Sequence, residues 1–189
     1  MTEMDNTFEE SEQVELEQFE APSSDPTPRA SLSGRPEGIF RGMWASLFYS
    51  GRMTGKTVLI TTSARREGAS TIACGLGLSG SGTAGGARVV LVDFNQWAPA
   101  LHKILHLSRG PGLGEILTGK QDIASAVQRV NENLDVLAIG SNERRSLAML
   151  RSNAIETLFQ QLAEIYDYVL VDSAAANHYP DSQVLSGVL

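Results

Sequence analysis

Four short apolar runs, separated by segments with a helical pattern, constrain the fold of this chain most. The runs cover residues 57–61, 89–92, 134–139 and 168–171, and each is rich in Val, Ile and Leu. They are continuous, whereas a strand with one exposed face would alternate apolar and polar residues. Because strands buried on both faces and joined through helices form parallel sheets, the sequence predicts an α/β fold with a doubly wound, mainly parallel sheet.

Apolar residues recur at helical spacing in three other segments. The first, residues 39–48, is predicted to be a short helix that docks over the sheet. The other two predicted helices carry the stripes Ile123, Ala126, Val127 and Val130, and Ile155, Leu158, Phe159, Leu162, Ile165 and Tyr166.

The segment that follows the first predicted strand is rich in glycine. Six glycines occur between residues 75 and 86, and each costs a helix interior about 1 kcal/mol relative to alanine. The sequence therefore predicts that the helix after the first strand is short and frayed, and too loose to organise a binding site.

The chain divides into an acidic tail and a nearly neutral body. Residues 1–38 hold ten of the 22 acidic residues and two of the 15 basic ones, and they are rich in Ser, Pro and Thr. This composition predicts a disordered tail over residues 1–38 and one folded domain over residues 39–189. A body without basic excess argues against nucleic-acid binding, because phosphate affinity comes from clustered Lys and Arg. With no membrane-length apolar run and no secretory signal pattern, the sequence predicts a cytoplasmic protein.

The residues after the first strand occupy the place of a phosphate-binding loop, because ligands of parallel sheets bind beyond the carboxyl ends of the strands. Gly68, Ser70 and Thr71 match the pattern G-x-x-x-x-G-K-[ST]. Ser63 stands in the place of the first glycine, and Ala69 stands in the place of the lysine. That lysine puts a full positive charge on the terminal phosphates, so its absence predicts badly weakened triphosphate binding.

Two of the other predicted strands end in an aspartate, Asp93 and Asp172. An aspartate at the tip of a parallel strand, near a phosphate loop, can hold magnesium directly or through water. Ser70 is the third candidate ligand, and the set applies only if Mg-ATP binds. An aspartate in such a place is as often a turn-former or a helix cap, so both interpretations stay open.

Five segments, taken in order and spacing, resemble the bacterial tyrosine kinases (BY-kinases) and chain-length regulators of capsular and exopolysaccharide synthesis. These segments are residues 67–71, 90–103, 112–119, 133–140 and 166–172; the first resembles P-G-E-G-K-S-T and the last resembles the Walker B strand F-D-Y-V-I-I-D. The resemblance covers about four fifths of the chain and implies a P-loop NTPase-like fold of the MinD/ParA (SIMIBI) group. It also implies that the domain over 39–189 is truncated at its carboxyl end. The strand that precedes the phosphate loop would then lie on a sheet edge. Its unpaired backbone groups favour association into a homo-oligomer.

The departures from the family pattern fall on the residues that carry its catalysis. Ala69 replaces the lysine, and Arg65 and Arg66 replace the preceding Pro-Gly. Residues 90–103 resemble the family's second Walker A region, V-L-L-I-D-A-D-L-R-R-P-x-x-H-K, and Asn95 replaces the second aspartate of that pattern. The resemblance therefore implies a non-catalytic pseudo-kinase homologue in which Asp93 and Asp172 are relics and no cofactor is bound. Such a protein would regulate exopolysaccharide or capsule biosynthesis or export through contact with an inner-membrane copolymerase, and would be peripheral to the membrane through that partner.

Two alternatives stay open. An active ATP-dependent tyrosine autokinase or ATPase with an altered loop would use Ser70, Asp93 and Asp172 around magnesium, with Arg65 or Arg66 on the phosphates. Against this, Arg66 stands where a glycine lets backbone amides approach the ligand, and its side chain should obstruct the loop. A MinD/ParA-like positioning ATPase ranks third, because the early second lysine and the membrane-binding carboxyl-terminal helix of that group are missing.

Overall fold

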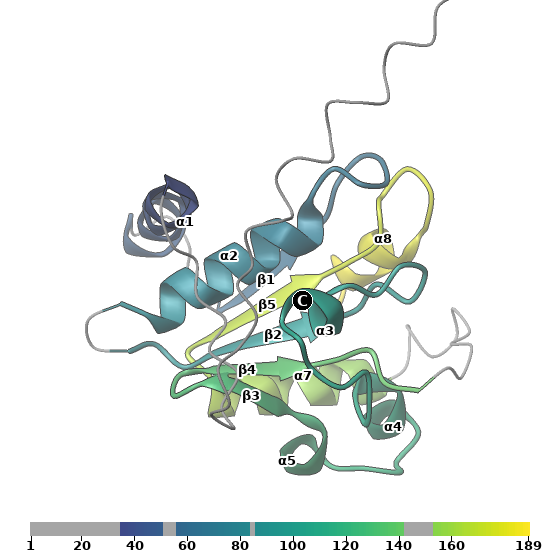
Figure 1. Cartoon of the computed structure of the whole chain (residues 1–189). Helices are drawn as coiled ribbons and strands as arrows, with labels where there is room; N and C mark the ends of the chain where they lie inside the picture. Colours follow the sequence, from purple (N-terminus) through teal and green to yellow (C-terminus); the bar gives the residue numbers. More distant parts are fainter. Residues whose placement is uncertain (1–34, 51–55, 84–85, 142–152) are drawn as a thin grey trace, which may run out of the picture.

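The structure is a computed structural model that describes residues 35–50, 56–83, 86–141 and 153–189 (Figure 1). Its sheet has the order β1-β5-β2-β4-β3. The strands β1, β5, β2 and β4 run parallel, and β3 is antiparallel to β4. This confirms the predicted α/β class with a mainly parallel sheet. The strands are β1 (Thr57–Ile60), β2 (Val89–Asp93), β3 (Gln128–Asn131), β4 (Leu134–Leu137) and β5 (Tyr168–Asp172).

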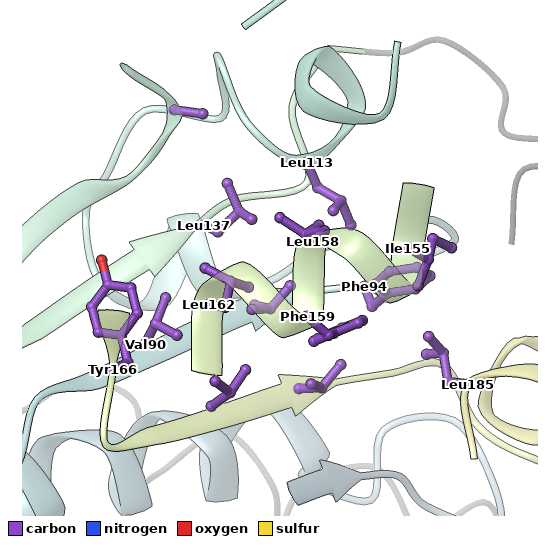
Figure 2. Packing of buried hydrophobic residues seen from close by; sticks show 14 of the residues in the cluster. Val90, Phe94, Leu113, Leu137, Ile155, Leu158, Phe159, Leu162, Tyr166 and Leu185 are labelled. Atoms are coloured by element: carbon purple, nitrogen blue, oxygen red, sulfur yellow. The ribbon is translucent and has the colours of Figure 1, made fainter. Parts of the chain in front are cut away.

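Helices cover both faces of the sheet, with α2 (Ala69–Ser81) on one face and α7 (Asn153–Ile165) on the other. The central strand β2 shows why its sequence is continuously apolar. Val90 and Val92 pack into the cluster that contains the apolar stripe of α7 (Figure 2). Val89 and Leu91 point to the opposite cluster, which contains the buried residues of α2. Because successive side chains of a strand point to opposite faces, a strand covered on both sides needs an apolar residue at every position.

The amino-terminal helix α1 (Arg35–Trp44) continues into one π-helical segment, η1 (Ala45–Tyr49). The helix begins four residues before the predicted boundary at residue 39, so residues 35–38, which were predicted to belong to the disordered tail, are helical. The rest of the predicted tail, residues 1–34, lies outside the described residues. The predicted docking on the sheet needs correction, because α1 packs mainly against α2 through Phe40 and Trp44. Trp44 of α1 and Phe48 of η1 also reach the sheet, where the centroids of their rings lie 5.0 and 4.4 Å from that of the Tyr168 ring.

Helix α2 is not short and frayed, as its glycines predicted, but runs for 13 residues and is largely buried. Three of these glycines face a neighbouring side chain. A Cβ atom at Gly75 would overlap Phe40, and one at Gly80 would overlap Trp44. The third, Gly77, faces Leu91 of β2. The glycines therefore let α1 and β2 approach the helix closely, and this packing outweighs their poor helix propensity.

The helix predicted over residues 123–130 is wrong after its first turn. Helix α5 covers only Ile123–Ala126, and Val127 is already extended, with ψ 144°. The chain then forms β3, where Arg129 is exposed and Val130 is 2% exposed. Arg129 pairs with Asp135 of β4 at 3.0 Å across the antiparallel ladder. Pairing with β4 and the burial of Val130 decide this segment, because the apolar spacing alone fits a helix.

Three short helices complete the described part: α3 (Leu101–Ile104), α4 (Leu113–Leu117) and α8 (Asp181–Leu185). Helix α8 follows β5 and lies at the same end of the sheet as the loop between β1 and α2 (Figure 1). No helix among the described residues is long and apolar enough to cross a membrane.

Candidate functional site

The candidate site lies at the carboxyl edge of the sheet, where the loops after β1, β5 and β2 meet. Backbone hydrogen bonds connect these loops directly: Ser173 N–H donates to the carbonyl of Ile60 at 3.0 Å, and Ala176 N–H donates to that of Thr62 at 2.9 Å. Phe94 N–H donates to the carbonyl of Asp172 at 2.8 Å. The three segments that the sequence singled out are therefore held side by side, where ligands of parallel sheets bind.

The loop between β1 and α2 is curled and braced by its own side chains. The hydroxyl of Ser63 and the N–H of Ala64 donate to one oxygen of the Glu67 carboxylate, at 2.9 and 3.0 Å. These two hydrogen bonds, first that from Ala64, hold the pKa of Glu67 below its ordinary value. The loop therefore keeps a defined shape although Ser63 replaces the first glycine of the phosphate-loop pattern.

Arg66 and Gly68 both adopt left-handed backbone conformations, with φ 65° and 87°. A non-glycine residue in this region costs about 1–2 kcal/mol, so Arg66 supplies under strain the conformation that a glycine adopts freely. Its side chain is exposed to solvent. The obstruction of the loop by Arg66 stays a prediction.

The predicted phosphate-binding residues Gly68, Ala69, Ser70 and Thr71 form the start of α2. The first intrahelical hydrogen bond runs from Ile72 N–H to the carbonyl of Gly68 at 2.9 Å. The N–H groups of residues 69–71 therefore precede the helical ladder, at the partially positive end of a well-formed helix. Ala69 contributes a methyl group where the phosphate-loop pattern has an ammonium group, and Thr71 is exposed.

The structure brings together Ser70, Asp93 and Asp172, the three candidate magnesium ligands. Asp93 and Asp172 are paired residues of β2 and β5, and both are 0% exposed. The hydroxyl of Ser70 donates to Oδ2 of Asp172 at 2.6 Å, and Oδ1 of Asp172 has no partner among the described residues. Asp93 accepts the N–H groups of Asn95 and Leu101, at 3.1 and 3.3 Å. Neither aspartate forms an ion pair within the described residues.

Burial dominates the electrostatics of this carboxylate pair. Desolvation raises the pKa of Asp93 to about 7, and the negative charge of Asp172 adds to the rise. Desolvation also raises the pKa of Asp172 to about 6, although the hydrogen bond from Ser70 opposes it. Two uncompensated carboxylates in one buried place attract a cation and repel an anion.

The oxygen atoms of Ser70, Asp93 and Asp172 suit a magnesium ion better than a triphosphate. A hydroxyl and two carboxylates are the oxygen ligands that magnesium prefers, so Ser70, Asp93 and Asp172 could hold that ion together with water. The described residues contain no cluster of three or more His, Cys, Asp or Glu able to hold a metal, so any such ion would need ligands of other kinds. A triphosphate fits less well, because Ala69 offers it no positive charge.

Three features of this edge were missed or misread from the sequence. Glu67 braces the loop, which no sequence pattern indicated. Asn95, read only as a lost aspartate, shapes a turn by accepting the N–H of Ala98 at 3.0 Å. Trp97 stacks on Tyr179, and its indole N–H donates to Asp181 at 2.9 Å. A lone tryptophan in the polar segment after β2 was the available signal for this contact.

Comparison with known proteins finds relatives that are named as bacterial tyrosine-protein kinases. No family model matches the sequence. CapB of Staphylococcus aureus is 23% identical over 164 residues, which are 86% of this chain and 69% of CapB. The tyrosine-protein kinase YwqD of Bacillus subtilis is 31% identical over 134 residues, which are 70% of this chain and 56% of YwqD. The chain therefore spans between about half and two thirds of these relatives.

The solved structures that resemble this chain include bacterial tyrosine kinase domains. The chimeric protein CapA2B2 matches with a TM-score of 0.74 and 26% identity, over 79% of this chain and 66% of that one. The kinase domain of the Escherichia coli tyrosine kinase ETK matches with a TM-score of 0.73 and 20% identity, over 81% and 60% of the two chains. A ParA family ATPase from Chlorobium tepidum shares the fold at a TM-score of 0.52 and 17% identity, over 70% and 57%. The chain is a homologue of the bacterial tyrosine kinases, built on the P-loop fold that their kinase domains share with ParA-like ATPases.

Proposed function

We propose that this chain is a non-catalytic pseudo-kinase homologue that regulates exopolysaccharide or capsule biosynthesis or export through contact with an inner-membrane copolymerase. The observation that carries the proposal is Ala69. The loop, the first turn of α2 and the pair of Ser70 with Asp172 are all built, yet a methyl group stands where a lysine would meet the terminal phosphates. A triphosphate would therefore approach two buried carboxylates without the cation that offsets their repulsion.

The expected loss of affinity is large. A hydrogen bond between a charged donor and a phosphate contributes about 1.5–3 kcal/mol, or roughly 10- to 150-fold in a dissociation constant. Asp93 and Asp172 also repel a triphosphate that arrives without magnesium, because both are buried and unpaired with any cation of the described residues. Magnesium can offset the aspartates, but it cannot also replace the lysine on the phosphates.

The partner and the pathway rest on the resemblance to chain-length regulators. We propose a cytoplasmic protein that is peripheral to the inner membrane through this partner. The strand β1 lies at one edge of the described sheet, with its outer backbone groups open to pairing, so self-association is part of the proposal.

An active tyrosine autokinase or ATPase is the second candidate, and one observation favours it. The hydrogen bond from Ser70 to Asp172, the adjacent Asp93 and the 13-residue helix α2 form the organised site that the glycine-rich sequence did not predict. In that case Arg65 or Arg66, both exposed on the loop, would supply the charge that Ala69 lacks. A ParA-like positioning ATPase ranks third, because the similarity to ParA structures is lower than that to the tyrosine kinase domains.

Isothermal titration with Mg-ATP separates the first two candidates. The wild-type chain should give no heat of binding up to about 1 mM nucleotide, whereas Ala69→Lys should bind in the range of about 10–100 μM. Ala69→Met is the matched control, because it adds length without charge and should remain silent. Micromolar binding by the wild type, abolished by Asp172→Ala, or radiolabelled phosphate on tyrosine of the purified chain, would favour the enzyme and refute the pseudo-kinase.

A further inference from the structure

An aromatic ledge, formed by Trp97 and Tyr179, lies at the same edge of the sheet as the candidate site. Trp97 belongs to the loop after β2 and Tyr179 to the loop after β5. Their rings are nearly parallel, with centroids 4.4 Å apart and an interplanar angle of 11°. Trp97 nevertheless remains 53% exposed. Because a parallel stack covers one face of a ring, the opposite face of the indole is open to solvent.

The indole is held in place from its edge. Its N–H donates to Oδ2 of Asp181 at 2.9 Å, and the side-chain amide of Gln96 donates to the same oxygen at 3.3 Å. Asp181 is the first residue of α8 and is 0% exposed. This hydrogen bond and the stack on Tyr179 orient the exposed aromatic surface in advance of any contact.

The charge behind the ring is negative and uncompensated. Oδ1 of Asp181 has no hydrogen-bond partner in the described part of the chain, and Asp181 forms no ion pair there. A hydrogen bond from an indole N–H to a carboxylate pushes electron density into the ring. This strengthens the attraction of the ring face for a cation, which arises from the ring quadrupole. Asp181 is thus a positioning residue, which acts through Trp97.

Of the cations that proteins carry, the guanidinium of arginine fits this ledge best. It is planar, so it stacks on an aromatic face, and it is more weakly hydrated than the ammonium of lysine. We propose that Trp97, with Tyr179 and Asp181 behind it, binds an arginine side chain in a basic segment of a partner protein. This inference rests on the proposed function as a contact protein and names the chemistry of the segment that it would contact.

The test uses fluorescein-labelled peptides that alternate glycine with arginine, or glycine with lysine, and follows their anisotropy at about 0.15 M salt. A cation–π contact at an exposed site contributes about 0.5–1 kcal/mol, or about 2- to 5-fold in affinity. The arginine peptide should therefore bind more tightly than the lysine peptide, and Trp97→Ala should weaken it about 2- to 5-fold. Trp97→Phe keeps a smaller ring and should lose less, and Asp181→Asn should also weaken binding of the arginine peptide, because the ring face then loses the electron density that the carboxylate supplies.

A second readout locates the contact. The chain has two tryptophans, and the other one, Trp44, is 0% exposed. Quenching of the emission by acrylamide therefore reports mainly on Trp97, and the arginine peptide should protect it. Equal affinity for the two peptides, or a Trp97→Ala variant that binds as the wild type does, would overturn the proposal. Protection of Trp97 by AMP alone, or by increasing protein concentration without peptide, would also overturn it, by assigning the ledge to a nucleobase or to a second copy.

These results are separable from the test of the pseudo-kinase. If the wild type fails to bind Mg-ATP and the ledge also fails to prefer arginine, the ledge is refuted and the pseudo-kinase stands. If the wild type binds Mg-ATP, the pseudo-kinase is refuted, whereas the anisotropy data still decide the ledge.

Discussion

Replacing Asp172 by asparagine should make the fold less sensitive to pH and more stable at alkaline pH. The substitution is nearly isosteric, and its amide oxygen can accept the hydrogen bond that the Ser70 hydroxyl now donates to Oδ2. The amide nitrogen would take the place of Oδ1, which has no partner among the described residues. The variant therefore removes a buried negative charge while keeping the one side-chain contact that the carboxylate makes.

The direction follows from the raised pKa values. Asp172 titrates near 6 and Asp93 near 7 in the folded chain, against an ordinary value of 3.8. Both carboxyl groups thus hold a proton more tightly in the folded state than in the unfolded one. The stabilisation that this gives is complete below about pH 4 and is lost as the pH rises through 6 and 7.

The magnitude follows from about 1.4 kcal/mol for each pKa unit. Between about pH 5.5 and 8.5 the wild type should lose about 2–3 kcal/mol of unfolding free energy from the two groups together. The Asp172→Asn variant should lose about 1 kcal/mol over the same range. It has lost one titrating group, and the remaining group, Asp93, no longer feels the charge of Asp172, which is the second cause of its raised pKa.

Urea unfolding followed by circular dichroism, at a series of pH values, measures this difference. The comparison of slopes is informative because any pH-independent cost of burying the amide nitrogen cancels from it. Asp122→Asn is a control that should leave the slope unchanged: hydrogen bonds from Ser125 hold the pKa of Asp122 below its ordinary value, so its contribution is lost only as the pH falls below about 4 and is constant between about pH 5.5 and 8.5. Equal slopes for the wild type and Asp172→Asn would refute the account of the site as a buried, uncompensated pair.

Three further predictions test the packing, the loop and the cation site. Gly80→Ala should lower the unfolding free energy by about 2 kcal/mol, because its methyl group would overlap Trp44. Gly42→Ala is the control, because a Cβ atom at Gly42 of α1 would have nothing within 4 Å. It should be neutral or stabilising by up to about 1 kcal/mol in the same urea experiment. Equal losses of unfolding free energy in the two variants would show that the overlap with Trp44 is not the cause. Arg66→Gly should raise the unfolding free energy by up to about 1 kcal/mol as the left-handed strain is relieved, and a loss would show that Arg66 makes a favourable contact. Magnesium without nucleotide should raise the Tm of the wild type more at about pH 8 than at about pH 6, because protons compete with the ion for the same carboxylate oxygens. The Tm of the Asp172→Asn variant should not change with magnesium, and an equal rise in that variant would place the ion elsewhere.

The parallel strands and the location of the site could be predicted because one physical constraint produces both. A strand buried on both faces must be apolar at each position, so β2 and β5 stand out in the sequence as continuous runs. The polar residues that end them, Asp93 and Asp172, then fall at one edge, because parallel strands share their direction. Ser70 joins them because the loop that precedes α2 leaves β1, a neighbour of β5, at the same edge.

The errors arose where contacts with distant segments decide the local structure. The apolar spacing of residues 123–130 fits a helix, but pairing with β4 and the contact of Arg129 with Asp135 turn its second half into β3. The glycines of α2 predict fraying by their propensity, but they face bulky side chains from α1 and β2 that need the room. No local pattern contains either partner, so neither outcome could be derived from the segment alone.

The candidate site keeps features that lower the stability of the fold, and these features indicate which ligands the protein still binds. The left-handed Arg66 and the buried Asp93 and Asp172 oppose folding at neutral pH. Sites that conflict with local stability are commonly maintained by a ligand. A pseudo-kinase that lacks the lysine but keeps Ser70, Asp93 and Asp172 should thus still bind magnesium while failing to bind ATP, and Ala69→Lys should restore ATP binding without changing magnesium binding. A wild-type chain that binds neither would instead identify the aspartates as relics, and the neutral Asp172→Asn variant would then be the more stable protein with no loss of binding.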